Sequence, residues 1–530
     1  MKTSFFKKTA LIALAAGFIM TSCTDDGPGP NDGKDETQYE KGYISMSIMS
    51  KFATKALGSG DVETGTAKEN SVNKIAVVLY DANTNAVNYL FVLNDTTVAG
   101  KDIYSVSNDK LTYVTEAREV DKKPYKLAVF LNPSDALLGT VAVNRPLSAM
   151  QTAADATVAS LTERGSSPAT VDNFLMSNFA GLVTVTTDNI YNTKEGAEKA
   201  PVPVHVERAV AKVILTIDGS FAANSHPGIS TSSIRWQVDV INKSTYWMRK
   251  QTKMLNGTEE TAYNNGNGVS IANRDSMYAE DTNFEKISAA YWATLTSPGY
   301  TQPVPSSYFT TIAADDITRE IKSDEYAYVT ENTMTAEEQW EDVTTSVVIK
   351  ATIIPTATAL GTTLGAAPYF VYGDSVFSGA ELQAIKEADE DNDAITTGVT
   401  WAQFKAAYGF ATTLQNFLND SGTTAVFGSD YASVSGTASL KHGSLKYFYD
   451  GVHYYNVPIR HFSNDLQPEQ MAYGRYGVVR NNVYKLTLNH IKKYGDITIP
   501  PKVNPDDNQS WLSVEFTILP WVIRSQGVGL

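Results

Sequence analysis

Short runs rich in β-branched and aromatic residues recur along almost the whole chain, and they constrain its fold more than any other feature. The runs VNKIAVVLYD (72–81) and YKLAVFLNP (125–133) are typical, and clusters of Gly, Asn, Asp and Ser separate such runs. This alternation indicates strands joined by turns, and the 28 tyrosines favour strands further. Because a chain of 530 residues is too long for one hydrophobic core, the sequence predicts a mainly β protein with more than one domain.

The first 22 residues have the pattern of an export signal. Lys2, Lys7 and Lys8 precede an apolar run at 9–20 that is too short to span a bilayer comfortably. Cys23 follows, and as the only cysteine in the chain it has no partner for an internal disulfide. The segment MTSC resembles a bacterial lipobox, so we expect lipid on Cys23 to anchor the precursor in the outer membrane. The alternative is an ordinary signal peptide that contains a cysteine.

A strand followed by an accessible lysine segment is predicted at GYISMSIMSKFATKALGSG (42–60). Ile44, Met46 and Ile48 alternate with serines, which indicates a half-buried strand. Lys51 and Lys55 then lie among small residues before Gly-Ser-Gly, a composition typical of protease-accessible loops. A strand beside a segment that a protease can cut can be a temporary part of the fold.

The rest of the chain is divided by a proline-marked boundary. In PVPVHVERAVAKVILTID (201–218), residues 204–217 have the alternation and length of one long strand that leads into a new sheet. We predict an N-terminal β-sandwich at 56–206 and a C-terminal β-sandwich at 207–530. The second carries a small helical insertion, because the pattern becomes helical at 378–420. Asp450-Gly451 is predicted to be a hairpin turn between two tyrosine-rich strands.

The last segment, WLSVEFTILPWVIR (511–524), reads as a second detachable strand. Its apolar residues alternate with Ser513, Glu515 and Thr517, as expected of a strand with one apolar face. These apolar residues are Leu512, Val514, Phe516 and Ile518.

Several classes of function are disfavoured. A net charge of −15 and a pI near 5.0 leave no basic surface for nucleic acid. The chain has no phosphate-binding loop, nucleophile elbow or zinc-protease motif, and its six histidines show no paired metal spacing. The sequence therefore predicts no enzyme activity, no metal site and no cofactor.

Taken in order, the elements of this chain resemble those of the Bacteroidales fimbrilins, and shaft subunits of the minor fimbrium type in particular. The resemblance rests on Cys23, the lysine segment, VNKIAVVLYD, YKLAVFLNP, FLMSN, VPVHVERAVAKVILTID, SIRWQVDV, VRNNVYKLTL and SVEFTILPW. It implies two transthyretin-like or immunoglobulin-like β-sandwich domains and export as a lipoprotein. It also implies that residues 23–55 are a lipidated linker and a propeptide strand, which a trypsin-like protease removes before the protein assembles at the cell surface. Fimbriae there support adhesion and biofilm formation.

The implied partners are other copies of this chain, accessory fimbrial subunits, and a host or bacterial receptor. Removal of a strand leaves a groove that the C-terminal strand of the next subunit can fill. The family typically has arginine at the processing site, but this chain has no arginine before Arg118. We therefore expect cleavage after Lys55, which makes Ala56 the new N-terminus, or after Lys51. Two alternatives are a tip or accessory adhesin and a glycan-binding surface lipoprotein whose aromatic residues stack on sugars.

Overall fold

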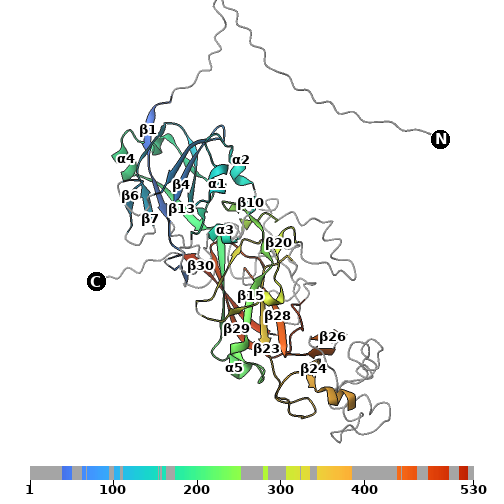
Figure 1. Ribbon diagram of the computed structural model, residues 1–530. Helices are drawn as coiled ribbons and strands as arrows, with labels where there is room; N and C mark the ends of the chain where they lie inside the picture. Colours follow the sequence, from blue (N-terminus) through green and yellow to red (C-terminus); the bar gives the residue numbers. More distant parts are fainter. Residues whose placement is uncertain are drawn as a thin grey trace, which may run out of the picture. The chain divides into compact units, whose positions relative to one another are not determined.

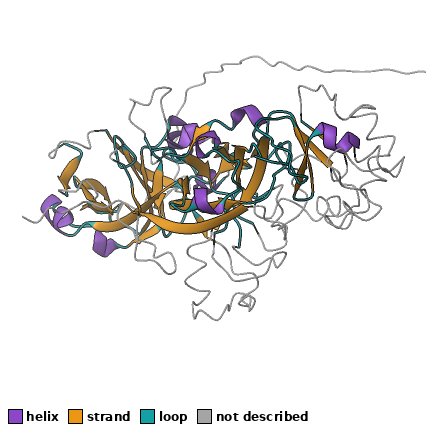
Figure 2. Ribbon diagram, turned by 90° about the horizontal axis from the view of Figure 1, so that it is seen from below, coloured by secondary structure: helices purple, strands orange, loops and turns teal. Residues whose placement is uncertain are grey.

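The computed structural model describes sixteen stretches of the chain, and all structural statements below refer to them. Backbone contacts divide the chain into two units, residues 1–40 and Lys41–Leu530, and every element named below belongs to the second unit. Strands dominate this unit and its described helices are short (Figures 1 and 2), so the predicted mainly β fold is confirmed. The described stretches are 39–49, 63–66, 68–94, 101–107, 112–152, 154–155, 158–162, 173–251, 279–283, 306–322, 324–334, 343–384, 439–442, 445–461, 475–500 and 512–522.

A nine-stranded sheet organises the N-terminal part of the unit. Strand β4 (Ile75–Asp81) is buried along its whole length and pairs with β5 (Val87–Leu93) and β9 (Tyr125–Leu131), which confirms the strands predicted at 72–81 and 125–133. In order across the sheet the strands are β5 (Val87–Leu93), β4 (Ile75–Asp81), β9 (Tyr125–Leu131), β11 (Met176–Asn178), β13 (Val202–Arg208), β2 (Met46–Met49), β7 (Thr112–Thr115) and β6 (Ile103–Val106), with β12 (Val183–Val185) beside β9.

Smaller elements accompany this sheet. A separate two-stranded pair consists of β1 (Lys41–Ile44) and β8 (Arg118–Asp121). The helices of this part are α1 (Asp135–Thr140), α2 (Leu147–Gln151), α3 (Val158–Thr162), α4 (Lys194–Lys199) and the 3₁₀ helix η1 (Thr187–Asn189).

The C-terminal part is built on a five-stranded sheet and two four-stranded sheets. The five-stranded sheet has the order β22 (Ala327–Thr330), β14 (Val210–Ile217), β29 (Asn482–Ile491), β30 (Leu512–Val522) and β3 (Glu63–Thr64). One four-stranded sheet has the order β21 (Arg319–Glu320), β15 (Arg235–Asp239), β23 (Ser346–Thr352) and β28 (Val452–Pro458). The other has the order β25 (Ser375–Phe377), β24 (Tyr369–Tyr372), β27 (Leu445–Phe448) and β26 (Leu440–His442).

Three short strand pairs and three short helices complete the described elements. The pairs are β10 (Ala154–Asp155) with β17 (Ser244–Thr245), β16 (Ile241–Asn242) with β20 (Phe309–Thr310), and β18 (Lys250–Gln251) with β19 (Ala279–Glu280). The helices are α5 (Phe221–Asn224), η2 (Thr231–Ser233) and η5 (Ala314–Asp316). Of the predicted helical insertion, residues 378–384 are described, and 379–384 are helical.

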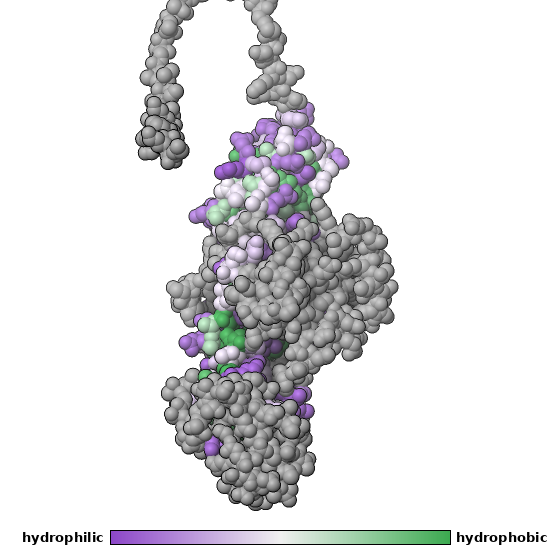
Figure 3. All heavy atoms as spheres, turned by 90° about the vertical axis from the view of Figure 1, so that its right-hand side faces the viewer, coloured by the Kyte–Doolittle hydropathy of each residue, from purple (hydrophilic) through white to green (hydrophobic). Residues whose placement is uncertain are grey.

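Two large clusters of buried apolar side chains form the cores of this unit. The first core contains residues of β2, β4, β9 and β13, and the second contains residues of β14, β15, β23 and β29. On the face in Figure 3 the described surface is a mixture of hydrophilic and hydrophobic residues, as expected when most large apolar side chains are inside. The long strand predicted across 204–217 is two strands in different sheets, β13 and β14, which meet at Ala209.

The hairpin predicted at Asp450-Gly451 is wrong. The turn exists, and Gly451 has a φ of +70°, a conformation that glycine adopts readily. However, the strands on its two sides belong to different sheets, because β27 pairs with β24 and β26 while β28 pairs with β23. A turn signal marks where the chain reverses, but it does not determine which strands become partners.

Candidate functional site

The N-terminal strand segment changes partners at Ser45. Before this residue, β1 pairs with β8, and Tyr43 and Tyr191 exchange backbone hydrogen bonds of 2.7 and 2.8 Å. At the change, the Ser45 hydroxyl donates to the Thr115 carbonyl at 2.7 Å, and the Met46 N–H donates to the Thr115 hydroxyl at 3.0 Å. Beyond it, β2 lies between β13, which is parallel to it, and β7, which is antiparallel.

The apolar face predicted for this segment is confirmed. The side chains of Ile44, Met46 and Ile48 are completely buried in the first core. Each buried side chain of this size contributes about 1.5–3 kcal/mol, so the three together contribute roughly 4.5–9 kcal/mol before ordering costs. Ser45 was expected on the opposite, more exposed face, but it is only 1% exposed because its hydroxyl is paired inside the sheet.

Close packing continues at the start of the segment, where a side chain would not fit on Gly42. A Cβ atom there would lie 2.7 Å from the Ile190 side chain and 2.9 Å from the Tyr191 carbonyl oxygen. The segment is thus seated along its described length. Because β2 is an interior strand, its removal would leave unpaired backbone groups on both β13 and β7.

The predicted terminal strand is present as β30, and it lies in a sheet of its own chain. It is antiparallel to β29, with a register shift between Leu488 and His490. Its outer edge pairs with β3 at Trp521 and Val522, so β30 has neighbours on both sides. The residues predicted to form its apolar face, Leu512, Val514, Phe516 and Ile518, stand opposite Ile491, Leu488, Leu486 and Tyr484, which are all buried in the second core.

The other predicted site residues lie outside the described part of the chain. These are the lipidation site Cys23 and the cleavage positions Lys51, Lys55 and Ala56. For the terminal strand the structure describes the backbone of 512–522 only.

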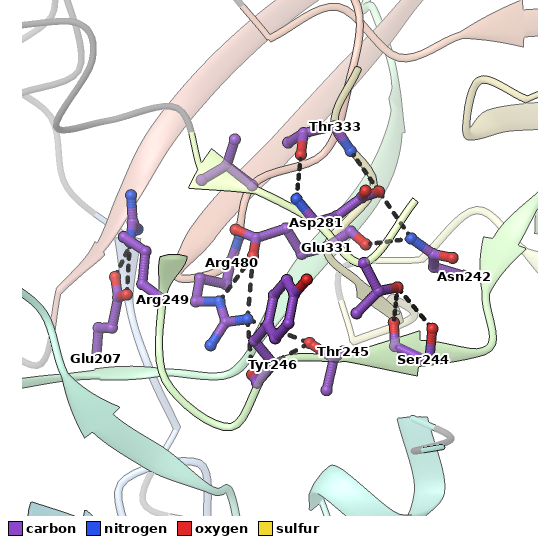
Figure 4. A network of polar contacts seen from close by, with 12 residues as sticks. Glu207, Asn242, Ser244, Thr245, Tyr246, Arg249, Asp281, Glu331, Thr333 and Arg480 are labelled. Carbon is purple, nitrogen blue, oxygen red and sulfur yellow. Dashed lines mark hydrogen bonds and ion pairs between the residues drawn. The ribbon is translucent and has the colours of Figure 1, made fainter. Parts of the chain in front are cut away.

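Buried ion pairs gather where the chain passes from β13 to β14 (Figure 4). Arg249 forms two hydrogen bonds with the Glu207 carboxylate, at 2.7 and 2.6 Å. Arg480 donates to Glu331 at 3.0 Å and also to the Thr245 hydroxyl at 3.1 Å. The four charged side chains of these pairs are at most 3% exposed. Each charge has lost its contact with water, and only the interaction with its partner and nearby hydrogen bonds compensates for that loss.

A third buried pair joins Glu69 to Lys212 of β14, with 3.0 Å between the oxygen and nitrogen atoms. The Tyr328 hydroxyl donates to the same carboxylate at 2.6 Å. Burial by itself would raise the pKa of Glu69, but Lys212, Tyr328 and the Thr66 N–H lower it overall, so Glu69 is ionised at neutral pH. Burial lowers the pKa of the neighbouring Arg208 to about 10, which leaves it charged at neutral pH as well.

The sequence did not reveal these three pairs. Their partners are 42, 143 and 149 residues apart, and no spacing rule links positions so distant. The only signal was a charged residue inside a strand pattern, such as Glu207 in VPVHVER. Such a residue indicates either an exposed face or a buried pair, and burial is decided by the tertiary structure.

We expect Arg249→Met to lower the free energy of unfolding by about 3–5 kcal/mol, because it leaves the Glu207 carboxylate buried without its partner. The measurement is urea unfolding of the full chain. The matched control is Arg235→Met, because Arg235 pairs with Glu320 at 3.4 Å where both side chains are partly exposed to solvent. This variant should cost less than about 1 kcal/mol. The prediction fails if both variants lose the same stability.

Within the described residues, nothing points to catalysis or metal binding. No group of three His, Cys, Asp or Glu side chains there could hold a metal ion. Two histidines are buried, His453 beside the Tyr369 hydroxyl and His461 beside the Tyr484 hydroxyl. Burial lowers the pKa of both, that of His461 to about 3, so they are neutral at pH 7. None of the described helices is long and apolar enough to span a bilayer.

Two protein-family models match this chain. The model of the major fimbrial subunit protein FimA matches residues 43–208. The model of the C-terminal part of fimbrillin, a major fimbrial subunit protein of type IV, matches residues 446–527. No curated protein sequence matches the chain significantly.

Several solved structures are similar to this chain at low sequence identity. A fimbrilin (FimA) from Porphyromonas gingivalis is 14% identical, with a TM-score of 0.40 over 91% of this chain and 98% of that one. A putative cell adhesion protein from Parabacteroides distasonis is 12% identical, with a TM-score of 0.39 over 92% and 98%. The tip fimbrial protein Mfa3 from P. gingivalis, with a C-terminal truncation, is 11% identical, with a TM-score of 0.37 over 91% and 100%.

Proposed function

We propose, from the premise that this chain belongs to the fimbrilin family of fimbrial subunit proteins, that it is a shaft subunit that polymerises by exchanging strands between copies. As a member of that family it is a structural subunit of a cell-surface fimbria and not an enzyme. The proposal adds how the subunit is exported, matured and joined to the next one.

The interior position of β2 carries the proposal. A strand at the edge of a sheet can leave without opening a groove, whereas β2 lies between β13 and β7. Its loss would expose two rows of backbone donors and acceptors together with the apolar sites of Met46 and Ile48, and β1, which leaves with it, would vacate the site of Ile44. Such a groove fits one kind of ligand well, an extended strand with apolar residues at every second position.

The C-terminal strand of a second copy meets this description. Its residues Leu512, Val514, Phe516 and Ile518 have the required period of two. If all four were buried, they would contribute roughly 6–12 kcal/mol before ordering costs. A donor that reproduced the pairing of β2 would run parallel to β13 and antiparallel to β7.

Cleavage is proposed to determine which strand occupies the groove. As long as β2 is part of the chain, its effective concentration at the groove exceeds that of any free strand. A cut after Lys55, or after Lys51, turns β2 into a separate peptide that can be displaced. Lysine is the only basic residue type between β2 and β3, so we propose a trypsin-like protease that accepts lysine.

The precursor is proposed to be a lipoprotein, anchored to the outer membrane through Cys23. Because the cut lies downstream of Cys23, the peptide that leaves the groove carries the lipid with it, so displacement of β2 also frees the subunit from its anchor. Donor and acceptor are different surfaces, so the contact is head-to-tail and continues as a filament instead of closing. Other copies and accessory subunits are then the partners, and adhesion and biofilm formation follow from a surface filament.

A labelled peptide of residues 511–524 tests the proposal directly. It should bind the lysine-cleaved protein and not the uncut protein, because only the cleaved form offers the groove. The control peptide carries Val514→Asp and Phe516→Asp, which place charges at positions that require apolar residues, and it should bind at least about ten-fold more weakly. Equal binding to cut and uncut protein, or none to either, would contradict strand exchange.

A further inference from the structure

The C-terminal strand has a small second neighbour that comes from the N-terminal part of the chain. Strand β3, Glu63–Thr64, pairs in parallel with Trp521 and Val522 of β30. It follows β2 and the lysine segment in the sequence, so the proposed cut lies upstream of it. The contact is therefore retained in the mature chain.

The position of this contact matters more than its length. Residues 492–511 connect β29 to the Leu512 end of β30, so that end stays close to its partner even when hydrogen bonds open. Peeling must start from the opposite end, which contains Trp521 and Val522. This is where β3 pairs with the strand, so even a short contact there suppresses the first step of release.

A buried ion pair anchors β3. The strand leads into a turn in which the Thr66 N–H donates to the Glu69 carboxylate at 2.6 Å and the Asn70 N–H donates to the Thr66 carbonyl at 3.1 Å. The Glu69 side chain is completely buried, and Lys212 and Tyr328 hold it from strands β14 and β22. Both strands belong to the sheet that contains β30.

Arg208 holds the backbone of the same turn. Its Nε donates to the Glu69 carbonyl at 3.3 Å, and its Nη2 donates to the Asn70 side-chain oxygen at 2.5 Å. The turn is thus attached to β13 as well as to β14 and β22. These contacts account for the location of β3, since a two-residue strand has too few hydrogen bonds to hold itself in place.

We infer that Glu63–Thr64, anchored through Glu69, is a latch that retains the C-terminal strand in the sheet of its own subunit until another subunit takes it. The inference rests on the proposed strand exchange. Cleavage controls access to the groove, and the latch adds control over the release of the C-terminal strand that fills it. A subunit with this latch delays the exposure of its apolar strand, which is a segment prone to aggregation while unpaired.

Hydrogen exchange of the uncut full chain tests the latch without any assembly step. In Glu69→Gln, Lys212 loses its charged partner, so the turn should loosen and the amides of Leu519, Trp521 and Val522 should exchange at least about ten-fold faster. Amides of β4 should be unchanged. The matched control is Lys68→Gln, an exposed position in the same turn, which should exchange like the unaltered protein. Unchanged exchange at 519–522 in Glu69→Gln, with β4 intact, would overturn the latch.

If the β4 amides of Glu69→Gln also exchange faster, the substitution has loosened the whole fold. Two proline variants then test whether β3 itself retains the C-terminal strand. Successive N–H groups of a strand point to opposite sides, so only one of Glu63→Pro and Thr64→Pro removes a donor that faces β30. One of the two should accelerate exchange at 519–522 about ten-fold more than the other. Acceleration by neither would overturn the latch.

Assembly of the same variants after lysine cleavage distinguishes this inference from the proposed function. Faster exchange with normal or faster polymerisation supports both. Faster exchange in a protein that never polymerises supports the latch and contradicts strand exchange. Polymerisation with unchanged exchange in the latch variants contradicts the latch alone.

Discussion

Lys55→Gln is expected to accumulate as a full-length precursor that does not polymerise. The substitution removes the proposed cut while leaving every described contact of β2 in place. A tethered strand acts at an effective concentration in the millimolar range, so a donor strand from a subunit at micromolar concentration is outcompeted by about a thousand-fold. We therefore expect the polymer ladder of the unaltered protein to be lost.

N-terminal sequencing and gel electrophoresis of surface-extracted protein measure this effect. Polymers of the unaltered chain should begin at Ala56. The matched control is Lys51→Gln, which changes the other lysine of the segment and should process normally. Polymers that begin at Phe52 would move the cut to Lys51, and polymers that retain Cys23 would contradict removal of the N-terminal strand.

Deletion of residues 511–530 is expected to give a folded monomer that does not assemble after lysine cleavage. Strand β29 keeps β14 as a parallel partner over six register positions, so the five-stranded sheet loses its outer strands but not its centre. Assembly should fall at least a hundred-fold, because the donor strand itself is missing, and size-exclusion chromatography of cleaved protein measures this.

A milder pair of variants tests whether assembly requires the apolar residues of the strand or only the presence of the strand. Val514→Asp with Phe516→Asp charges the predicted apolar face and should abolish assembly. Ser513→Asp with Thr517→Asp adds the same charge at the alternate positions and should leave assembly largely intact. Ladders formed by the deletion variant would show that another part of the chain joins the subunits.

A cleaved deletion variant should also shorten filaments of the intact protein. It still has the acceptor groove, so it can receive a strand, but it has none to donate. Each such subunit therefore terminates a filament, and the mean ladder length should decrease as its proportion increases. No change in ladder length at equal amounts of the two proteins would mean that groove and donor are not separate surfaces.

Local pattern predicted individual strands well in this chain. The apolar runs at 72–81 and 125–133 are buried strands that pair with each other, and the alternation at Ile44, Met46 and Ile48 matches complete burial. These predictions succeed because side chains on a strand alternate between two faces. The order of apolar and polar residues therefore indicates directly which face is buried.

Pairing between distant segments could not be predicted in the same way. The turn at Asp450-Gly451 joins strands of different sheets. Strand β2 has β13 as a neighbour although more than 150 residues separate them. Backbone hydrogen bonds are the same for every sequence, so a strand pattern specifies which face is buried and leaves the choice of neighbour to the packing of the whole sheet.

The sequence by itself determined that this chain is mainly β, that apolar residues alternate along 43–49 and 512–518 as they do in strands, and that its order of elements resembles that of the fimbrilins. Only the tertiary structure decided that β2 is an interior strand, that β30 rests between β29 and β3, and that Glu69, Glu207 and Glu331 are buried with basic partners. The reason is physical. Alternation is a property of neighbouring residues, whereas burial of a charge depends on whether a partner more than 40 positions away is brought within hydrogen-bond distance.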